Sequence, residues 1–472
     1  MALITMKFGG TSVGSPEAIT SVVGITGDEV RRGNSVIVVV SAMSGATDML
    51  LGSVREAVTG NRWAYLNAAQ KLRERHEEAL NLLAPAAPSR ESVKHEVNAI
   101  LDQHIELCNA VSILGEATPR ITDAAVSFGE RMSARVVALA LRTAGVEAQA
   151  LDATQLIATD ANFGSASVHW PETNAAIEAK LQPLLDKGIV PVITGFIGAT
   201  ADGHVTTLGR GGSDYSSAIF AAATASDELI IWTDVDGVMT TDPRIDRRAR
   251  VLPYVSYQEV GELAFYGAKV LHPKTVQPIL NRQIPLRVRN TFNPAHPGTL
   301  IGPTNEPAET VIKAVTSIRS VSLLTVGGKG MIGVPGIAGR TFLAAASAGA
   351  NILMIAQASS EQSFCFVVMD DRTLQVKHSI ESALEEEIER QDVDLVEVLE
   401  DVAIVTAIGS GMRGTPGVAG RVFTTMGSNR VNVVAIAQGA SECSISFVVA
   451  EHDLKQAVVA LHDLALEAVP VT

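Results

Sequence analysis

Three stretches of consecutive apolar residues, rich in valine and isoleucine, lie in the first half of the chain. They cover residues 36–41, 189–194 and 229–233. Polar residues scarcely interrupt them, which is typical of strands that are buried on both faces. Helical patterns occur between such stretches, for example at 127–144 and 213–226. This alternation predicts a three-layer α/β domain with a mainly parallel sheet.

The first domain has a helical insertion and a recognisable end. Residues from about 62 to 120 are charged and show a helical pattern, which predicts an excursion from the sheet. The segments 290–298 and 303–307 are rich in Pro, Gly and Asn, as in a domain exit followed by a linker. We therefore expect the first domain to cover residues 1–303.

Beyond this linker the chain repeats itself. Residues 321–368 align without a gap on residues 402–449, at a constant offset of 81. Each copy has the pattern strand, glycine-rich loop, helix, strand, turn, strand. Two such small copies predict a pair of α+β modules, because a solenoid needs three or more repeats. We expect these modules at 304–390 and 391–472.

Both repeats carry a G-x-G-x-x-G loop, at 328–333 and 409–414. A dinucleotide site also needs an acidic residue about 20 positions later, at the end of the second strand. Neither repeat has one there. A loop that binds a small ligand or another subunit is the better interpretation.

The composition of the chain argues against several classes of binding partner. The net charge of −14 disfavours nucleic acid, whose recognition needs a basic surface. No window has the apolar length of a membrane span, and the N-terminal region lacks the pattern of a signal peptide. Cys108, Cys365 and Cys443 are far apart and show neither a metal spacing nor a disulfide framework. We expect a cytoplasmic protein that binds neither nucleic acid nor membranes.

The most informative motif is at the N-terminus, where an apolar run ends at Lys7 and is followed by Gly9 and Gly10, two hydroxyl residues and a helix start. Glycines let the backbone approach a phosphate, and the N–H groups of a helix start point towards it. Lys7 stands where a cation would meet the outer phosphates of a nucleotide. The alternative is a plain strand-to-helix turn with an exposed lysine.

Two further elements carry candidate chemistry. The loop 208–214 sets Arg210 and Asp214 among three glycines, and an arginine can hold a carboxylate with two parallel hydrogen bonds. Helix capping would explain the acid alone. The segment 233–244 follows a buried strand, where ligands of α/β sheets bind, and its spacing excludes an EF-hand loop. Glu130 is either a site residue or an acid favoured by the dipole of its helix.

Six motifs, taken in order, resemble those of aspartate kinases, which belong to the amino-acid kinase family and carry two C-terminal ACT-type regulatory repeats. The resemblance covers nearly the whole chain. The motifs lie at 7–13, 40–44, 127–130, 208–214, 233–244 and 267–273.

The resemblance implies a role for each matched residue. The phosphate cradle would consist of Lys7, Gly9, Gly10 and Ser12. The aspartate pocket would consist of Thr47, Glu130 and Arg210, with Arg210 on the α-carboxylate and Glu130 near the α-ammonium. Asp214 matches a residue close to the transfer centre and is, with Lys7, the predicted catalytic pair. The nucleotide contacts would be Thr233, Asp234, Met239, Arg244 and Lys269, and Met239 stands where the family often has a tyrosine.

The implied reaction is phosphorylation of the β-carboxylate of L-aspartate by ATP, the first step of lysine, threonine and methionine biosynthesis. Mg²⁺ would be held through the ATP phosphates, without a metal site of the protein's own. The β-carboxylate is already an anion, so catalysis needs positioning and neutralisation of charge and no general base.

Three alternatives stay open. The chain could be a kinase of the same fold for glutamate, acetylglutamate, carbamate or UMP. It could be an inactive amino-acid sensor, or the kinase half of a bifunctional kinase–homoserine dehydrogenase. The sequence leaves no room for a dehydrogenase after the repeats, so we expect a monofunctional enzyme.

The repeats predict regulation and assembly. Gln357 and Gln438 occupy equivalent strand ends beside the glycine-rich loops. In the aspartate kinases that the chain resembles, threonine-sensitive members carry glutamine at these positions. We therefore expect feedback inhibition by threonine, with lysine as the second choice. A buried amide that satisfies backbone groups is the alternative. Strand edges and an apolar helix face on each repeat predict a homodimer or homotetramer.

Overall fold

The computed structural model describes residues 1–267, 271, 273–303, 310–331, 334–357 and 362–467. The chain forms two compact units. The first contains Met1–Val238, Val251–Tyr257 and Val270–Thr304, and the second contains Met239–Arg250, Gln258–Lys269 and Asn305–Thr472.

The first unit is built on a sheet with the strand order β3-β4-β2-β1-β7-β9-β10-β8. Its described pairs are parallel except for β9–β10, which confirms the predicted mainly parallel sheet. The strands are β1 (Leu3–Phe8), β2 (Ser35–Val40), β3 (Ala148–Leu151), β4 (Val190–Thr194), β7 (Glu228–Thr233), β8 (Tyr254–Ser256), β9 (Leu286–Asn290) and β10 (Thr299–Gly302). A separate hairpin pairs β5 (Ile197–Ala199) with β6 (Val205–Thr207).

Helices cover both faces of this sheet because side chains along a buried strand alternate between the faces. In β2, Val36, Val38 and Val40 pack into one apolar core, and Ile37 and Val39 pack into another. The first core includes residues of α1 (Pro16–Arg31), α2 (Ala46–Val58) and α5 (Pro119–Thr143). The second includes residues of α6 (Trp170–Leu185) and α7 (Gly212–Ala223). The short helix α9 (Pro273–Leu280) belongs to the same unit.

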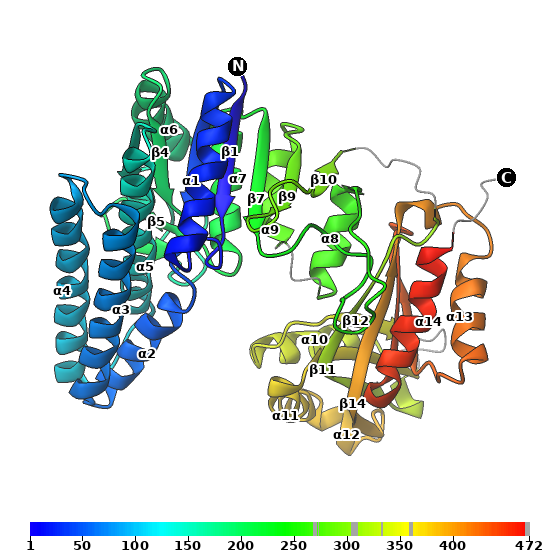
Figure 1. Ribbon diagram of the computed structural model, residues 1–472. Coiled ribbons are helices and arrows are strands. Elements are labelled where there is room, and N and C mark those ends of the chain that lie inside the picture. Colours follow the sequence, from blue (N-terminus) through cyan, green and yellow to red (C-terminus); the bar gives the residue numbers. More distant parts are fainter. Residues whose placement is uncertain (268–270, 272, 304–309, 332–333, 358–361, 468–472) are drawn as a thin grey trace. The chain divides into compact units, whose positions relative to one another are not determined.

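The predicted helical insertion is present as α3 (Arg62–Leu83) and α4 (Arg90–Leu114), followed by the start of α5. Figure 1 shows α3 and α4 side by side as long helices. Their apolar residues Leu72, Leu80, Val97 and Leu101 join the core of α1 and α5, so the insertion packs onto the helices that cover the sheet.

The second unit contains a six-stranded antiparallel sheet with the order β12-β13-β11-β14-β16-β15. Its strands are β11 (Ala314–Gly327), β12 (Met354–Gln357), β13 (Ser363–Met369), β14 (Leu395–Ile408), β15 (Ala435–Gln438) and β16 (Ser444–Ala450). Its helices are α8 (Tyr257–Phe265), of which all but the first residue belong to this unit, α10 (Ile337–Ser347), α11 (Thr373–Ala383), α12 (Glu385–Glu389), α13 (Val418–Ser428) and α14 (Leu454–Leu466).

The two repeats complete each other's sheet. The long strands β11 and β14 pair along most of their length, with register shifts near residues 318–323. Ser320 and Asp401, at the repeat offset of 81, both have a positive φ, of 57° and 54°. Before this kink β11 pairs with the second half of β14, and after it with the first half. Each repeat therefore gains an outer strand from the segment that precedes the other repeat.

Within the described part of the chain, we find no helix with the length and apolarity needed to cross a membrane.

Candidate active site

The candidate active site lies at the edge of the sheet where its parallel strands end. Gly9, Ser41 and Gly195 follow β1, β2 and β4, and each donates its backbone N–H to the carbonyl of a residue in a neighbouring strand. These N···O distances are 3.1, 3.1 and 2.8 Å. Loops that bind ligands in open α/β sheets occupy this edge.

The two predicted catalytic residues meet at this edge. Lys7, near the end of β1, places its Nζ 2.5 Å from Oδ1 of Asp214, which lies in the first turn of α7. Both side chains are largely buried. A Cβ added at Gly9 would lie 3.7 Å from Lys7 Nζ, so the ammonium group extends over the glycine loop. A cation and a bare backbone thus face the same space, as phosphate binding requires.

The loop after β2 is tied to the glycine loop. Ser44 donates its backbone N–H to the Gly10 carbonyl at 3.0 Å. A Cβ at Gly10 would lie 3.1 Å from the Ala42 carbonyl oxygen, which explains why a residue without a side chain is needed there. Thr47, half-buried in the first turn of α2, follows directly. The loop with the predicted phosphate contacts and the loop that leads to the predicted aspartate contact Thr47 are therefore joined by a hydrogen bond.

Ser12 has a structural contact in addition to its predicted role. Its hydroxyl is fully buried, lies 2.7 Å from Oγ1 of Thr291 and donates to the Trp232 carbonyl at 3.3 Å. These bonds fasten the glycine loop to the ends of β7 and β9. Its phosphate contact stays a prediction.

Glu130 is buried in α5, at 3% exposure. Its Oε1 accepts a hydrogen bond from the Ala42 backbone N–H at 3.3 Å, and its Oε2 has no hydrogen-bond partner. Burial raises the pKa of Glu130 from its ordinary value of 4.5 to about 8. A buried carboxyl group with one unpaired oxygen is a site that a substrate ammonium group would satisfy.

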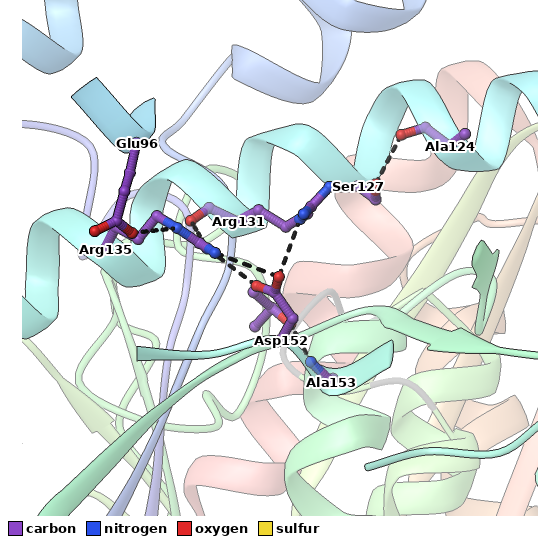
Figure 2. Close-up of polar contacts among 8 residues, drawn as sticks. Glu96, Ala124, Ser127, Arg131, Arg135, Asp152 and Ala153 are labelled. Carbon is purple, nitrogen blue, oxygen red and sulfur yellow. Dashed lines mark hydrogen bonds and ion pairs between the residues drawn. The ribbon is translucent and has the colours of Figure 1, made fainter. Parts of the chain in front are cut away.

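Residues on the other side of α5 anchor the helix that carries Glu130. Asp152, directly after β3, accepts hydrogen bonds from Arg131 Nε at 3.2 Å and from Arg135 Nη1 at 3.0 Å (Figure 2). Arg135 also donates to Glu96 of α4 at 3.2 Å. The register of α5 against the sheet edge is thereby fixed. The sequence analysis did not single out Asp152.

A second overlooked acid, Asp123, positions the loop of Arg210. Asp123 is 3% exposed, and its carboxylate accepts hydrogen bonds from the backbone N–H groups of Gly164 and Thr207 at 2.8 and 2.9 Å and from the Thr207 hydroxyl at 2.8 Å. Thr207 ends β6, three residues before Arg210, whose side chain is exposed. Asp123 lies on the same helix as Glu130, so α5 bonds both the loop after β2 and the strand that leads to Arg210.

The predicted nucleotide contacts Thr233 and Asp234 lie at the end of β7. The Thr233 hydroxyl donates to Oδ1 of Asp234 at 3.2 Å. The next acid, Asp236, accepts hydrogen bonds from the side-chain amides of Asn290 and Asn293 at 2.9 and 3.1 Å. Asp236 is therefore part of the loop's framework.

The remaining predicted nucleotide residues lie elsewhere. Met239 and Arg244 belong to the second unit. Arg244 is exposed and makes a two-pronged ion pair with Asp242, with an Nη2–Oδ2 distance of 2.6 Å. This hydrogen bond raises the pKa of Arg244 and lowers that of Asp242. Lys269 lies outside the described residues. All three stay predicted contacts.

The two glutamines of the repeats lie where the repeat alignment predicts. Gln357 ends β12 and Gln438 ends β15. Gln438 lines a cavity of about 480 Å³ together with the first turn of α13 and Glu442. Gln357 lines a cavity of about 870 Å³ that residues of β11, β14 and β15 also line, so both repeats contribute to it.

Comparison with known proteins agrees with this geometry. Residues 2–290 match the amino acid kinase family, and residues 324–384 and 405–464 match the ACT domain. The chain is 36% identical over 465 residues to bifunctional aspartokinase/homoserine dehydrogenase 1 of Arabidopsis thaliana, covering 97% of this chain and 50% of that protein. It is 32% identical over 472 residues to aspartokinase 1 of Arabidopsis thaliana, covering 98% of this chain and 80% of that protein. Both relatives are chloroplastic.

Among solved structures, E. coli aspartokinase III with aspartate and ADP superimposes with a TM-score of 0.82 at 29% identity, covering 98% of this chain and all of the other. The same enzyme with lysine and aspartate gives a TM-score of 0.77. The chain spans about half the length of the bifunctional relatives. It belongs to the amino acid kinase family and, within it, to the aspartokinases.

Proposed function

We propose that the chain transfers the γ-phosphoryl group of ATP to the β-carboxylate of L-aspartate, giving 4-phospho-L-aspartate and ADP. The observation that carries the proposal is the Lys7–Asp214 pair beside the bare loop at Gly9, on the same sheet edge as the buried carboxyl group of Glu130. One part suits phosphates and the other suits an amino acid. The product would enter lysine, threonine and methionine biosynthesis.

In this proposal each charged group of the two substrates is bound by a different set of residues. Lys7 neutralises charge on the transferred phosphoryl group, and the N–H groups of the glycine loop that are not bonded within the protein hold the phosphates. Glu130 and Arg210 hold the α-ammonium and α-carboxylate of aspartate, and Thr47 contacts the substrate from α2. The β-carboxylate attacks as an anion, so no residue removes a proton. The main contribution of the protein is alignment.

ATP and Mg²⁺ would bind together at the glycine loop. Across the described residues there is no cluster of three or more His, Cys, Asp and Glu side chains able to hold a metal. The bare glycine loop and the Lys7 ammonium group, which also pairs with Asp214, fit the phosphates of a nucleotide that brings its own cation. When bound, Mg²⁺ neutralises phosphate charge.

Turnover tests this proposal. ADP release, measured in a coupled assay, should require L-aspartate and should not occur with glutamate, acetylglutamate, carbamate or UMP. Hydroxylamine should trap the acyl phosphate as a hydroxamate in proportion to the ADP formed. Activity with another acceptor, or ADP release without hydroxamate, would contradict the proposal.

We infer further that threonine inhibits the enzyme through the repeats, with lysine the second choice. Support comes from the matched positions of Gln357 and Gln438, each lining a cavity large enough for an amino acid. An amide side chain can both donate and accept hydrogen bonds, as a hydroxylated amino acid requires. Binding would shift the kinase towards a less active state by about 1–3 kcal/mol.

The effector assignment is tested by Gln357→Ala and Gln438→Ala. Both should raise the threonine concentration needed for inhibition and leave uninhibited turnover nearly intact. Gln456→Ala is a matched control, because that amide donates to the Asn429 carbonyl on the far end of α13. Unchanged threonine sensitivity in both variants, or inhibition by lysine alone, would contradict the assignment.

The assembly and the compartment complete the proposal. We expect a homodimer or homotetramer through the repeats, because β12 and β15 are the edges of their sheet and expose Ile355 and Ile436 by 46% and 47%. A monomeric mass at micromolar concentration would contradict this. The described cysteines Cys108, Cys365 and Cys443 are all free, which supports a reducing compartment such as the cytoplasm.

A further inference from the structure

An arginine on the helical insertion joins the two loops of the candidate active site. Arg75, on α3, donates from Nη1 to the Ser44 carbonyl and from Nη2 to the Gly14 carbonyl, both at 2.6 Å. Gly14 closes the glycine loop after β1, and Ser44 lies in the loop after β2. One half-buried guanidinium group thus binds both loops from a third element.

The junction between these loops leaves little room for movement. A Cβ at Gly14 would lie 3.0 Å from the Gly10 carbonyl oxygen and 3.4 Å from the Cβ of Ser44. The Ser44 backbone N–H already donates to Gly10. Arg75 occupies two carbonyl groups that the loops themselves leave free. Its planar fork can bind both at once, which a lysine ammonium group on a flexible stem cannot match.

Each loop carries a different part of the reaction. The glycine loop begins with Gly9 beside Lys7, on the phosphate side. The other loop leads into α2 and Thr47, on the aspartate side. A residue that fixes the spacing of these loops fixes the spacing of phosphoryl donor and acceptor, and small misplacements of reacting groups are costly to the rate.

We propose that Arg75 is a positioning residue that aligns the phosphate loop with the aspartate loop. This inference rests on the proposed function, since it assigns donor and acceptor to the two loops. Arg75 acts through its hydrogen bonds to the backbone of the two loops. Its loss therefore reduces kcat while each substrate still binds its own loop, so both KM values change little.

The experiment compares Arg75→Ala, Arg75→Lys and the control Arg73→Ala. Arg73 lies on the same helix but pairs with Asp102 of α4, at 2.8 Å. In Arg75→Ala, kcat should fall by about 10- to 100-fold, with both KM values within about threefold of the parent. Arg75→Lys should recover part of kcat, and Arg73→Ala should keep it.

Amide hydrogen exchange gives a readout that does not depend on activity. In Arg75→Ala, peptides covering 9–15 and 41–47 should exchange faster than in the parent or in Arg73→Ala. Unchanged amide hydrogen exchange in either loop would show that Arg75 does not hold the two loops together. Faster exchange with unaltered kcat, or a loss of activity carried by KM alone, would overturn the positioning role. If the wild-type enzyme does not phosphorylate aspartate, the proposed function is wrong. The hydrogen-exchange result then still tests whether Arg75 holds the two loops together.

Discussion

Replacing Glu130 with glutamine is the sharpest test of the aspartate pocket. The wild-type carboxyl group is buried, has one unpaired oxygen and has its pKa raised to about 8. At pH 7 it is therefore about nine-tenths protonated in the empty pocket. If the α-ammonium of aspartate binds there, Glu130 ionises as the substrate enters. Aspartate binding should then release about 0.9 proton per site at pH 7.

The size of the effect follows from the same pKa. One pKa unit corresponds to about 1.4 kcal/mol, so ionising Glu130 at pH 7 costs about 1.4 kcal/mol. The apparent affinity for aspartate should therefore be about tenfold weaker at pH 7 than near pH 9, where Glu130 is ionised and most of the substrate still carries its ammonium group. Glu130→Gln has no charge to form and loses a charged hydrogen bond worth about 1.5–3 kcal/mol. Its kcat/KM for aspartate should fall by about 10- to 150-fold near pH 9, where the wild-type carboxylate is already ionised, and by less at pH 7.

Calorimetry in two buffers of different ionisation enthalpy measures the released proton directly. The wild type should release about 0.9 proton at pH 7 and much less near pH 9, and Glu130→Gln should lack the release at pH 7. Glu96→Gln is the control, because Glu96 also lies near α5 but is half-exposed and pairs with Arg135. No proton release in the wild type, or equal release in Glu130→Gln, would refute the reasoning.

The same pKa shift makes the stability of the ligand-free protein depend on pH. A native pKa above the unfolded value of about 4.5 means that the folded state binds more protons between these values. Stability should then fall as the pH rises from about 4.5 to about 8. This slope should be smaller in Glu130→Gln, as urea titrations at several pH values would show.

Three further substitutions test the rest of the site. Lys7→Ala should fold normally and lose about 10²–10³ in kcat in the ADP-release assay, because a preorganised charge is removed; near-normal turnover would contradict its role. Arg210→Lys should raise KM for aspartate more than KM for ATP, because lysine lacks the planar fork, and equal effects would count against the assignment. Asp123→Asn should lower the free energy of unfolding by about 1–3 kcal/mol, because one of three donors loses its acceptor, and should raise KM for aspartate; unchanged urea midpoints would contradict this.

The parts of the fold that could be predicted from the sequence are those with a local cause. A buried parallel strand must be apolar on both faces, so residues 229–233 identify β7 within one residue. The repeats were visible because the same residues recur at one offset. The helices α11 and α14, which follow the last strand of each repeat, were not predicted. The apolar spacing of Leu454, Val458 and Leu461 would have indicated α14.

The candidate site was predictable where a motif is continuous in sequence. Lys7 and Asp214 were both selected, and the structure brings them to 2.5 Å. Asp123, Asp152 and Arg75 were not selected, because a single acid or arginine in a helix or loop has the same sequence pattern whether it is buried and paired or solvated. Their partners lie 17 to 84 residues away, so only the fold reveals them.

The segment Met239–Arg250 matches the amino acid kinase family but belongs to the second unit, with the repeats. Buried polar contacts explain this. Asp246 accepts from Nδ1 of His462 at 2.9 Å, and Nε2 of the same ring lies 2.8 Å from Oγ1 of Thr240. The pKa of Asp246 is lowered, chiefly by its hydrogen bond with Arg248. His462 is fully buried in α14, so separating this loop from α14 would leave several polar groups unpaired, at about 1–3 kcal/mol for each.

This attachment has a consequence for regulation. The segment Met239–Arg250 belongs to the second unit and contains two of the predicted nucleotide contacts, Met239 and Arg244. Glu259 of α8 likewise pairs with Lys313 at 3.0 Å and accepts the Ser410 backbone N–H at 2.7 Å, in the glycine-rich loop of the second repeat. If an effector binds beside that loop as proposed, it contacts a unit that also contains the predicted nucleotide contacts Met239 and Arg244. The two proposals are linked through the chain itself, because the chain passes through both units more than once.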